Sequence, residues 1–220
     1  MNKLWSIHGT LFAYPPLSMK SWISILFVCL GLCSFDTGIN ERIVEKAYIE
    51  RFTSLAIDEM KRVGIPASIT LAQAVVESNA GQSKLAIKSN NHFGIKCKSY
   101  WTGQQYYHKD DDFDKKGKLI ESCFRAYMDI EASFKDHSDF LKSSEKYSEL
   151  FALDITDYKG WAIGLMSSGY ATDKTYALKL ITIIEDFQLY RFDTFQTGEF
   201  DLPKIIPAGF KTVLPESTVD

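Results

Sequence analysis

The sequence predicts an α+β fold that is mostly α-helical, with a small β-hairpin lobe inserted after the third helix. Apolar residues recur close to helical spacing through most of 41–190, as is typical of helices that pack around one core. Between 97 and 127 a polar run separates two short apolar pairs, which indicates a hairpin. Hydrophobic residues make up 45% and charged residues 24% of the 220 residues, values that exclude a wholly disordered chain or a multi-span membrane protein.

The helices predicted before the hairpin have clear start and stop signals. Residues 41–63 carry apolar positions near helical spacing, and Gly64 follows as a stop. Pro66 opens a second helix over the sequence ASITLAQAVVES, which ends at Asn79-Ala80-Gly81. We expect a short third helix over the sequence KLAIKS.

The rest of the chain completes the predicted domain. In the hairpin, the run DDDFDKKGK separates the two strands and Gly117 lies at the turn. Helical patterns return at 130–142, 157–167 and 174–188. The tail from 191 holds three prolines and little periodicity. We therefore expect an N-terminal extension and signal peptide over 1–40, one domain over 41–190 and a C-terminal extension over 191–220.

The N-terminal segment is typical of an export signal. Residues 22–32, WISILFVCLGL, form an apolar run behind Lys20, and this run is shorter than the roughly 20 residues that span a bilayer. The true start is either Met1 or Met19. Leu30-Gly31-Leu32-Cys33 resembles a bacterial lipobox, which would place a lipid on Cys33; ordinary cleavage nearby is the alternative.

The cysteines and the charge limit the class of protein further. Two of the four cysteines, Cys97 and Cys123, lie outside the signal and bracket the hairpin, so an oxidising compartment would favour a disulfide between them; two free thiols are the alternative. The net charge of −3 argues against a general nucleic-acid binder. The Asp-rich hairpin lacks the glycine of a calcium loop, and the His and Cys residues lack zinc spacing, so we expect no metal and no cofactor.

Glu77 is the acidic residue whose position fits catalysis best. It follows the apolar run Ala74-Val75-Val76 and lies in the last turn before a glycine stop. Burial beside valines and the negative end of the helix dipole both disfavour the ionised form of such a side chain. A carboxylic acid that keeps its proton near neutral pH is what a general acid needs.

Five sequence blocks resemble the glucosaminidase domain of glycoside hydrolase family 73, which includes bacterial autolysins and the flagellar-rod muramidase. In chain order they are AVVESNAGQSKLA, NNHFGIK, FRAY, Ser133 with Asp136-His137, and GYATD. They span about 50–190 in family order. The resemblance implies a lysozyme-like fold, in which a groove separates a helical lobe from a small β lobe.

The resemblance also implies roles for individual residues. Glu77 matches the family's catalytic acid, and Tyr170 of the GYATD block matches a tyrosine that helps to orient the sugar N-acetyl group or a water. Phe93, Gly94 and Asn91 match the segment that walls the cleft. The second carboxylate falls in the β lobe: Asp111 is the first choice, with Asp110 and Glu121 as alternatives. Attack by the substrate's own 2-acetamido group would make that carboxylate unnecessary.

The sequence therefore predicts an exported peptidoglycan hydrolase that cleaves the β-1,4 bond after N-acetylglucosamine. Trp101 and Tyr106 are expected to stack on sugars, and Arg125 and Lys96 to meet the acidic peptide stems. We expect a monomer with glycan strands as its partner and with membrane contact only through the signal or a lipid. A lytic transglycosylase, which shares the ES-x-x-G motif, a muramidase and a non-catalytic wall-binding module stay open as alternatives.

Overall fold

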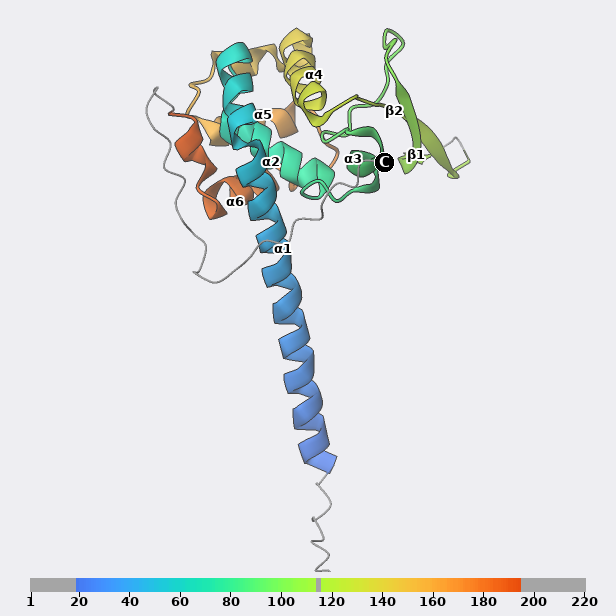
Figure 1. Ribbon diagram of the computed structural model, residues 1–220, viewed down its shortest axis with the longest axis vertical. Coiled ribbons are helices and arrows are strands. Elements are labelled where there is room, and N and C mark those ends of the chain that lie inside the picture. The colour runs from blue at the N-terminus through green and yellow to red at the C-terminus, as the bar shows by residue number, and fades with distance from the viewer. Residues whose placement is uncertain (1–18, 114–115, 195–220) are drawn as a thin grey trace, which may run out of the picture.

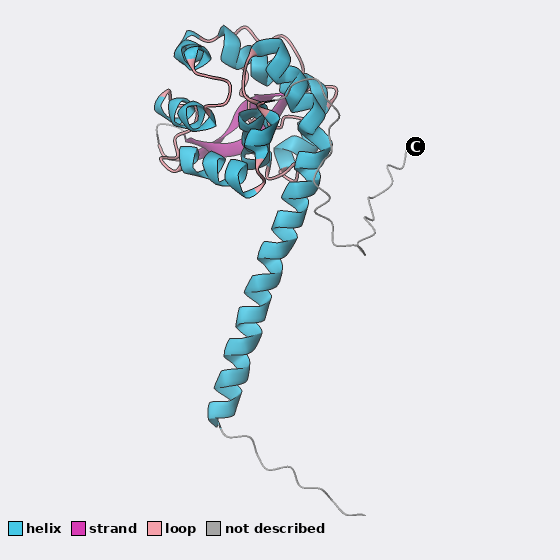
Figure 2. Ribbon diagram, turned by 90° about the vertical axis from the view of Figure 1, so that its left-hand side faces the viewer, coloured by secondary structure: helices cyan, strands magenta, loops and turns pink. Residues whose placement is uncertain are grey.

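The computed structural model describes residues 19–113 and 116–194, with the backbone alone for 19–39 and 110–113. In these residues six α-helices and two short 3-10 helices surround one core, and a two-stranded antiparallel sheet lies at its edge (Figure 1). In Figure 2, which views the molecule from the opposite edge, the strands lie behind the helices. The predicted class, mostly α with a small β-hairpin lobe, is confirmed.

Helix α1 (Met19–Val63) is longer than the helix predicted over 41–63. Figures 1 and 2 show its N-terminal part extending away from the helical body, while its C-terminal part packs on α2 (Ala67–Ser78). No break marks the expected boundary at residue 40, since 19–40 contains no proline to interrupt the helix. Gly64, at φ +89°, ends the helix as predicted. In the part of the chain that the structure describes, no helix combines the length and the apolar character needed to cross a bilayer.

Helix α2 occupies the centre of the fold and begins after Pro66, as predicted. All of its residues except Val76 and Glu77 are buried. Pro66 provides no side-chain cap, and the cap comes instead from Asp193, whose carboxylate accepts hydrogen bonds from Ser68 N at 2.8 Å and Ser68 Oγ at 2.6 Å. Burial raises the pKa of Asp193 to about 6. The packed body therefore continues past residue 190, where the sequence places the end of the domain.

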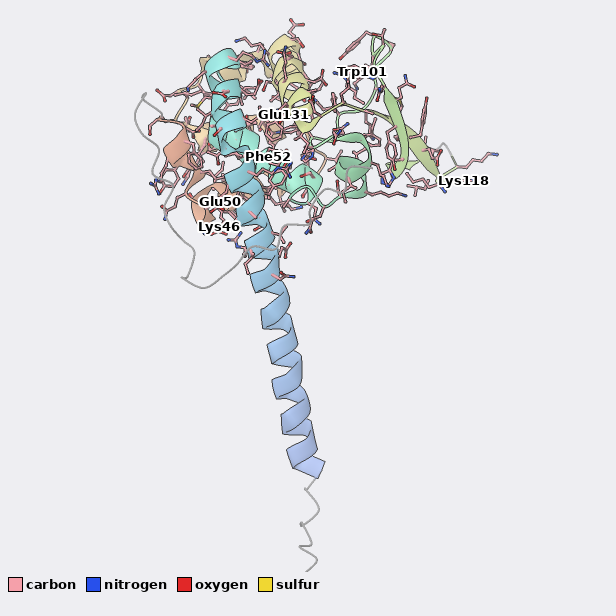
Figure 3. The ribbon with its side chains drawn as sticks, in the orientation of Figure 1. Lys46, Glu50, Phe52, Trp101, Lys118 and Glu131 are labelled. Carbon is pink, nitrogen blue, oxygen red and sulfur yellow. A yellow bond between two sulfur atoms is a disulfide. The ribbon has the colours of Figure 1, made fainter. Side chains whose placement is uncertain are left out.

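The hairpin consists of β1 (Gln105–Phe113) and β2 (Leu119–Arg125). The two strands are antiparallel, with Gln105 opposite Arg125 at one end and Phe113 opposite Leu119 near the turn. The hairpin follows α3 (Lys84–Ser89), as predicted. Figure 3 places Lys118 at the end of the hairpin that points away from the helices. The structure joins Cys97 and Cys123 in a disulfide with Cα atoms 5.3 Å apart. Since Cys97 N also donates to Cys123 O at 2.8 Å, the loop before β1 is fixed to β2.

The C-terminal half of the domain completes the core. Helices α4 (Ile130–Ser143), α5 (Tyr158–Ser167) and α6 (Tyr176–Asp186) match the predicted helices within two residues at each end. Two 3-10 helices, η1 (Glu145–Ala152) and η2 (Leu189–Phe192), were not predicted. The largest side chains of the core include Trp161, Phe134, Leu141, Leu165, Leu180 and Ile184. The tail from 195 lies outside the described residues.

Candidate active site

A cavity of about 750 Å³ opens beside the end of α2. It is bounded by Glu77, by the loop that follows α3, by α4 and η1, and by the loop between α5 and α6. The lining residues are Glu77, Phe93, Gly94, Ile95, Lys96, Lys98, Phe140, Lys146, Tyr147, Gly169, Tyr170, Ala171 and Thr172. The carboxylate chosen from the sequence therefore lies in a hollow large enough for sugar rings.

Glu77 is half-buried, because α2 emerges from the core only at its last turn. The chain after it turns sharply: Asn79, Ala80 and Gly81 have φ values of 51°, 49° and 79°. Ser78 Oγ accepts a hydrogen bond from Gly81 N at 2.7 Å and so stabilises this turn. Since Asn79 N also donates to Val75 O, the position of Glu77 is fixed by the backbone on both sides.

A buried tyrosine, Tyr176, holds the Glu77 carboxyl group. Tyr176 Oη donates to Glu77 Oε1 at 2.7 Å, and Gln73 Nε2 donates to Tyr176 Oη at 3.1 Å. Burial is the main cause that raises the pKa of Tyr176, and unfavourable electrostatic interactions with Tyr170 and Glu77 add to it. The phenol therefore stays protonated and acts as a donor to Glu77 at any physiological pH.

The loop after α3 brings backbone against the other carboxyl oxygen. Asn91 is buried; its Nδ2 donates to Ile95 O at 3.0 Å and Arg125 O at 2.8 Å, and its Oδ1 accepts from Phe93 N at 3.3 Å and Ile95 N at 3.1 Å. The loop can turn because Gly94 has φ +64°. A Cβ at Gly94 would lie 3.9 Å from Glu77 Oε2. Asn91 thus shapes the cavity wall from inside and is not itself part of the lining.

Tyr170 lines the cavity and contacts this loop. Its hydroxyl is 3.5 Å from Phe93 O, and its ring stacks on Tyr176 with centroids 5.7 Å apart. Burial, followed by the negative charge of Glu77, raises the pKa of Tyr170 well above its ordinary value. Tyr170 is therefore a neutral phenol that can donate a hydrogen bond to a ligand beside Glu77.

His137 supports this wall without facing the cavity. It is fully buried, and its ring stacks on Phe93 at 3.9 Å. Neither ring nitrogen has a hydrogen-bond partner among the described residues. Burial lowers the pKa of His137 to about 3, so the ring is neutral and acts as a packing surface.

Several residues that the sequence proposes for substrate contacts lie away from the lining. Arg125 is buried, and its Nη1 donates to both carboxylate oxygens of Asp136 at 2.8 Å. Trp101 donates through Nε1 to Gln104 O at 2.9 Å and packs under the Arg125 guanidinium. Tyr106 is half-buried on β1 and stacks with His108. The structure uses these side chains to build the base of the hairpin.

The position of the second carboxylate is only partly described. Glu121 is exposed on β2 and does not line the cavity. Asp110 and Asp111 belong to strand β1, but their side chains lie outside the described residues. Within the residues whose side chains are described, no three His, Cys, Asp or Glu side chains gather as metal ligands would.

Four residues that contact Glu77 or line the cavity are not among the site residues predicted from the sequence: Tyr176, Tyr147, Lys146 and Thr172. Tyr176 falls inside the helix predicted over 174–188. Its contact with Glu77 joins residues 99 positions apart, and helical spacing carries no information on such contacts. The one available signal was its place just after the GYATD block.

Comparisons with known proteins agree with this geometry. Residues 53–189 match the family described as glucosaminidase, mannosyl-glycoprotein endo-beta-N-acetylglucosaminidase. The chain is 34% identical to the exo-glucosaminidase LytG of Bacillus subtilis (strain 168) over 155 residues, or 68% of this chain and 54% of that protein. It is 31% identical to the peptidoglycan hydrolase FlgJ of Pseudomonas aeruginosa over 66% of this chain and 37% of that protein. The chain therefore spans about half or less of these relatives.

A solved structure shares the fold. The catalytic domain of the autolysin Auto from Listeria monocytogenes superposes with a TM-score of 0.60 and 27% sequence identity. The match covers 68% of this chain and 87% of that chain. The helical body and the hairpin described above are therefore an arrangement that is already known from a bacterial autolysin.

Proposed function

Because the chain belongs to the glucosaminidase family, we propose that it is an exported peptidoglycan hydrolase that cleaves the β-1,4 bond after N-acetylglucosamine. The observation that carries this proposal is the placement of Glu77. It is a half-buried carboxyl group at the wall of a cavity of about 750 Å³, held by a neutral tyrosine on one side and facing a glycine on the other.

Glu77 acts as the general acid. Its proton passes to the glycosidic oxygen as the bond from that oxygen to C1 lengthens, so the leaving sugar departs as a neutral alcohol. Gly94 suits this role because a hydrogen in place of a side chain leaves space beside Glu77 Oε2. Tyr176 orients the carboxyl group through Oε1, which leaves Oε2 as the oxygen that carries the proton toward the substrate.

The opposite face of C1 is attacked by a water or by the substrate's acetamido oxygen. We propose Asp111 as the base for the water route, with Asp110 and Glu121 as alternatives. Tyr170 supports either route, because a neutral phenol that lines the cavity can hold a water or the N-acetyl group by a hydrogen bond. A retaining mechanism with a protein nucleophile would need the two carboxyl groups about 5–5.5 Å apart.

Export is supported by the apolar run 22–32 and by the disulfide between Cys97 and Cys123. Disulfides persist in oxidising compartments such as the periplasm and the cell surface. We propose the cell envelope as the location, either after signal cleavage or through a lipid on Cys33. One relative named above, FlgJ of Pseudomonas aeruginosa, is a peptidoglycan hydrolase, and peptidoglycan is a polymer of that compartment.

The experiment that tests this function is digestion of purified peptidoglycan, followed by borohydride reduction and analysis of the new ends. Cleavage after N-acetylglucosamine gives reduced glucosamine ends. Reduced muramic acid ends would assign the activity of a muramidase, and 1,6-anhydro ends that of a lytic transglycosylase. If no new ends form while the protein still binds glycan, the chain is a wall-binding module and the proposal is wrong.

A further inference from the structure

A second cavity, of about 450 Å³, adjoins the first. The two share Lys98, Phe140, Lys146 and Tyr147 as lining residues, so they form one continuous cleft. The second cavity is otherwise lined by Tyr100, Ser143 and Ser144. No acidic side chain among the described residues lines this part of the cleft, and both of its charged residues are lysines.

Both lysines are placed by the fold. Lys146 Nζ donates to Gly169 O at 2.7 Å and lies 5.3 Å from the centre of the Tyr147 ring. One N–H of the ammonium group is thereby used, and two point elsewhere. Lys98 follows Cys97, whose disulfide and backbone hydrogen bond fix it to Cys123. The fold therefore fixes the ammonium group of Lys146 directly and the backbone from which the exposed Lys98 side chain extends.

Several lysines outside the cleft pair with carboxylates. Lys159 pairs with Glu185 at 2.8 Å and Lys179 with Asp173 at 2.7 Å. Among the described residues, neither Lys98 nor Lys146 has a carboxylate within ion-pair distance. In a chain of net charge −3, two positive charges without counter-ions in one cleft favour a ligand that carries negative charge there.

We propose that the second cavity is a subsite for a carboxylate of the acidic peptide stem on the muramic acid next to the cleaved bond. The proposal rests on the proposed function and deepens it by naming the substrate as glycan that still carries its stems. Lys98 and Lys146 pair with the stem carboxylate, and the hydroxyls of Ser143 and Ser144 face the peptide. Neutral sugar can accept hydrogen bonds from these lysines but carries no charge to pair with theirs.

The test compares kcat/KM on three substrates: glycan strands with free stem carboxylates, the same strands with those carboxylates amidated, and strands whose stems have been removed and whose exposed lactyl carboxylates have been amidated. The wild-type protein should prefer the first substrate by about three- to tenfold at low salt, as expected for partly exposed charge pairs. The Lys98→Gln and Lys146→Gln variants should each lower this ratio toward one, and Lys98→Arg should retain it. Using the ratio removes any general effect of Lys146→Gln on the loop at Gly169.

Lys135→Gln is the matched control, since Lys135 is exposed and lines neither cavity. It should keep the wild-type ratio. Equal rates on the three substrates, or a ratio unchanged in both glutamine variants, would overturn the subsite. A second outcome would also overturn the subsite. If stem-bearing strands were still preferred over stem-free strands after amidation, and an added phosphate-rich wall polymer abolished that preference, the lysines would be assigned to phosphate. Failure of the proposed function looks different, because no substrate would then yield new ends.

Discussion

The role proposed for Glu77 depends on its place in a helix. It is one of two residues of α2 that are not buried, so the helix delivers it from the core to the cavity wall. The turn at 79–81 prevents the helix from continuing, and Tyr176 fixes the carboxyl group. The reactivity of the site should therefore depend on neighbours that touch no sugar.

Tyr176→Phe tests this dependence. The hydroxyl hydrogen bond favours the ionised carboxylate, so its removal should keep the proton on Glu77 to higher pH and move the alkaline limb of the activity profile upward. We also expect kcat to fall by about tenfold, since a hydrogen bond to a charged group contributes on the order of 1.5 kcal/mol. Steady-state rates measured across pH provide both readouts.

Tyr158→Phe is the matched control, because Tyr158 Oη donates to the exposed Glu185 at 3.2 Å, away from the cavity. It should leave the pH profile of activity unchanged. A Tyr176→Phe variant with the wild-type profile would mean that the hydroxyl only packs against Glu77.

Gly94→Ala tests the space beside Glu77 Oε2. At φ +64° an alanine costs about 1 kcal/mol of unfolding free energy, and its methyl group would occupy the approach to Oε2. We expect hydrolysis to fall at least about tenfold while stability falls only modestly. Gly64→Ala separates the two effects, since Gly64 has φ +89° and no atom within 4 Å of a Cβ. It should show a similar loss of stability with full activity; equal activity losses in both variants would contradict this role for Gly94.

At the scale of elements, α2 depends on a cap that arrives from the far end of the domain. Asp193 lies 125 residues from Ser68 and satisfies its N–H and hydroxyl. Asp193→Ala should lower the unfolding free energy by about 1–2 kcal/mol, the usual cost of a lost N-cap. Denaturant unfolding measures this loss of free energy. Asp129→Ala is the control, since it removes an exposed cap at the start of α4. If Asp193→Ala left the unfolding free energy unchanged while Asp129→Ala lowered it, the contact with Asp193 would contribute nothing to α2.

The presence of most helices could be predicted from the sequence, because the helical period and the Gly and Pro signals each depend on a short stretch of neighbouring residues. The predicted ends of α2 at Pro66 and at Asn79-Ala80-Gly81 are confirmed. Helix η1 was missed because a 3-10 turn with only Tyr147 and Leu150 buried has too few apolar positions to show a period. The roles of the side chains were harder to predict. Arg125 matches a family block, yet its charge is paired with Asp136 inside the protein, and only tertiary structure shows such pairing.

At the scale of the whole molecule, two buried histidines link stability to pH. Burial lowers the pKa of His92 to about 4 and that of His137 to about 3, against 6.5 in the unfolded chain. The folded protein keeps both rings neutral while the unfolded chain binds protons. Their contribution to stability is therefore complete above pH 6.5 and is lost as pH falls toward 4.

The unfolding free energy should therefore fall between pH 7 and pH 4.5, by up to about 1.4 kcal/mol per pH unit for each histidine. Denaturant unfolding at several pH values measures this slope. His137→Leu removes one titrating group and leaves no unpaired ring nitrogen, so its slope should be shallower than that of the wild type. Identical slopes would show that His137 does not stay neutral in the folded state.

The central claim concerns one proton on Glu77 and the bond that it cleaves. The most direct measurement is the rate at which purified peptidoglycan releases new reducing ends, compared between the wild-type protein, Glu77→Gln and Glu149→Gln, an exposed residue that does not line the cavity. Because an amide cannot donate the carboxyl proton, Glu77→Gln should fall by at least about a hundredfold while Glu149→Gln keeps the wild-type rate. If Glu77→Gln, folded and glycan-binding, released ends as fast as the wild type, Glu77 would not be the acid.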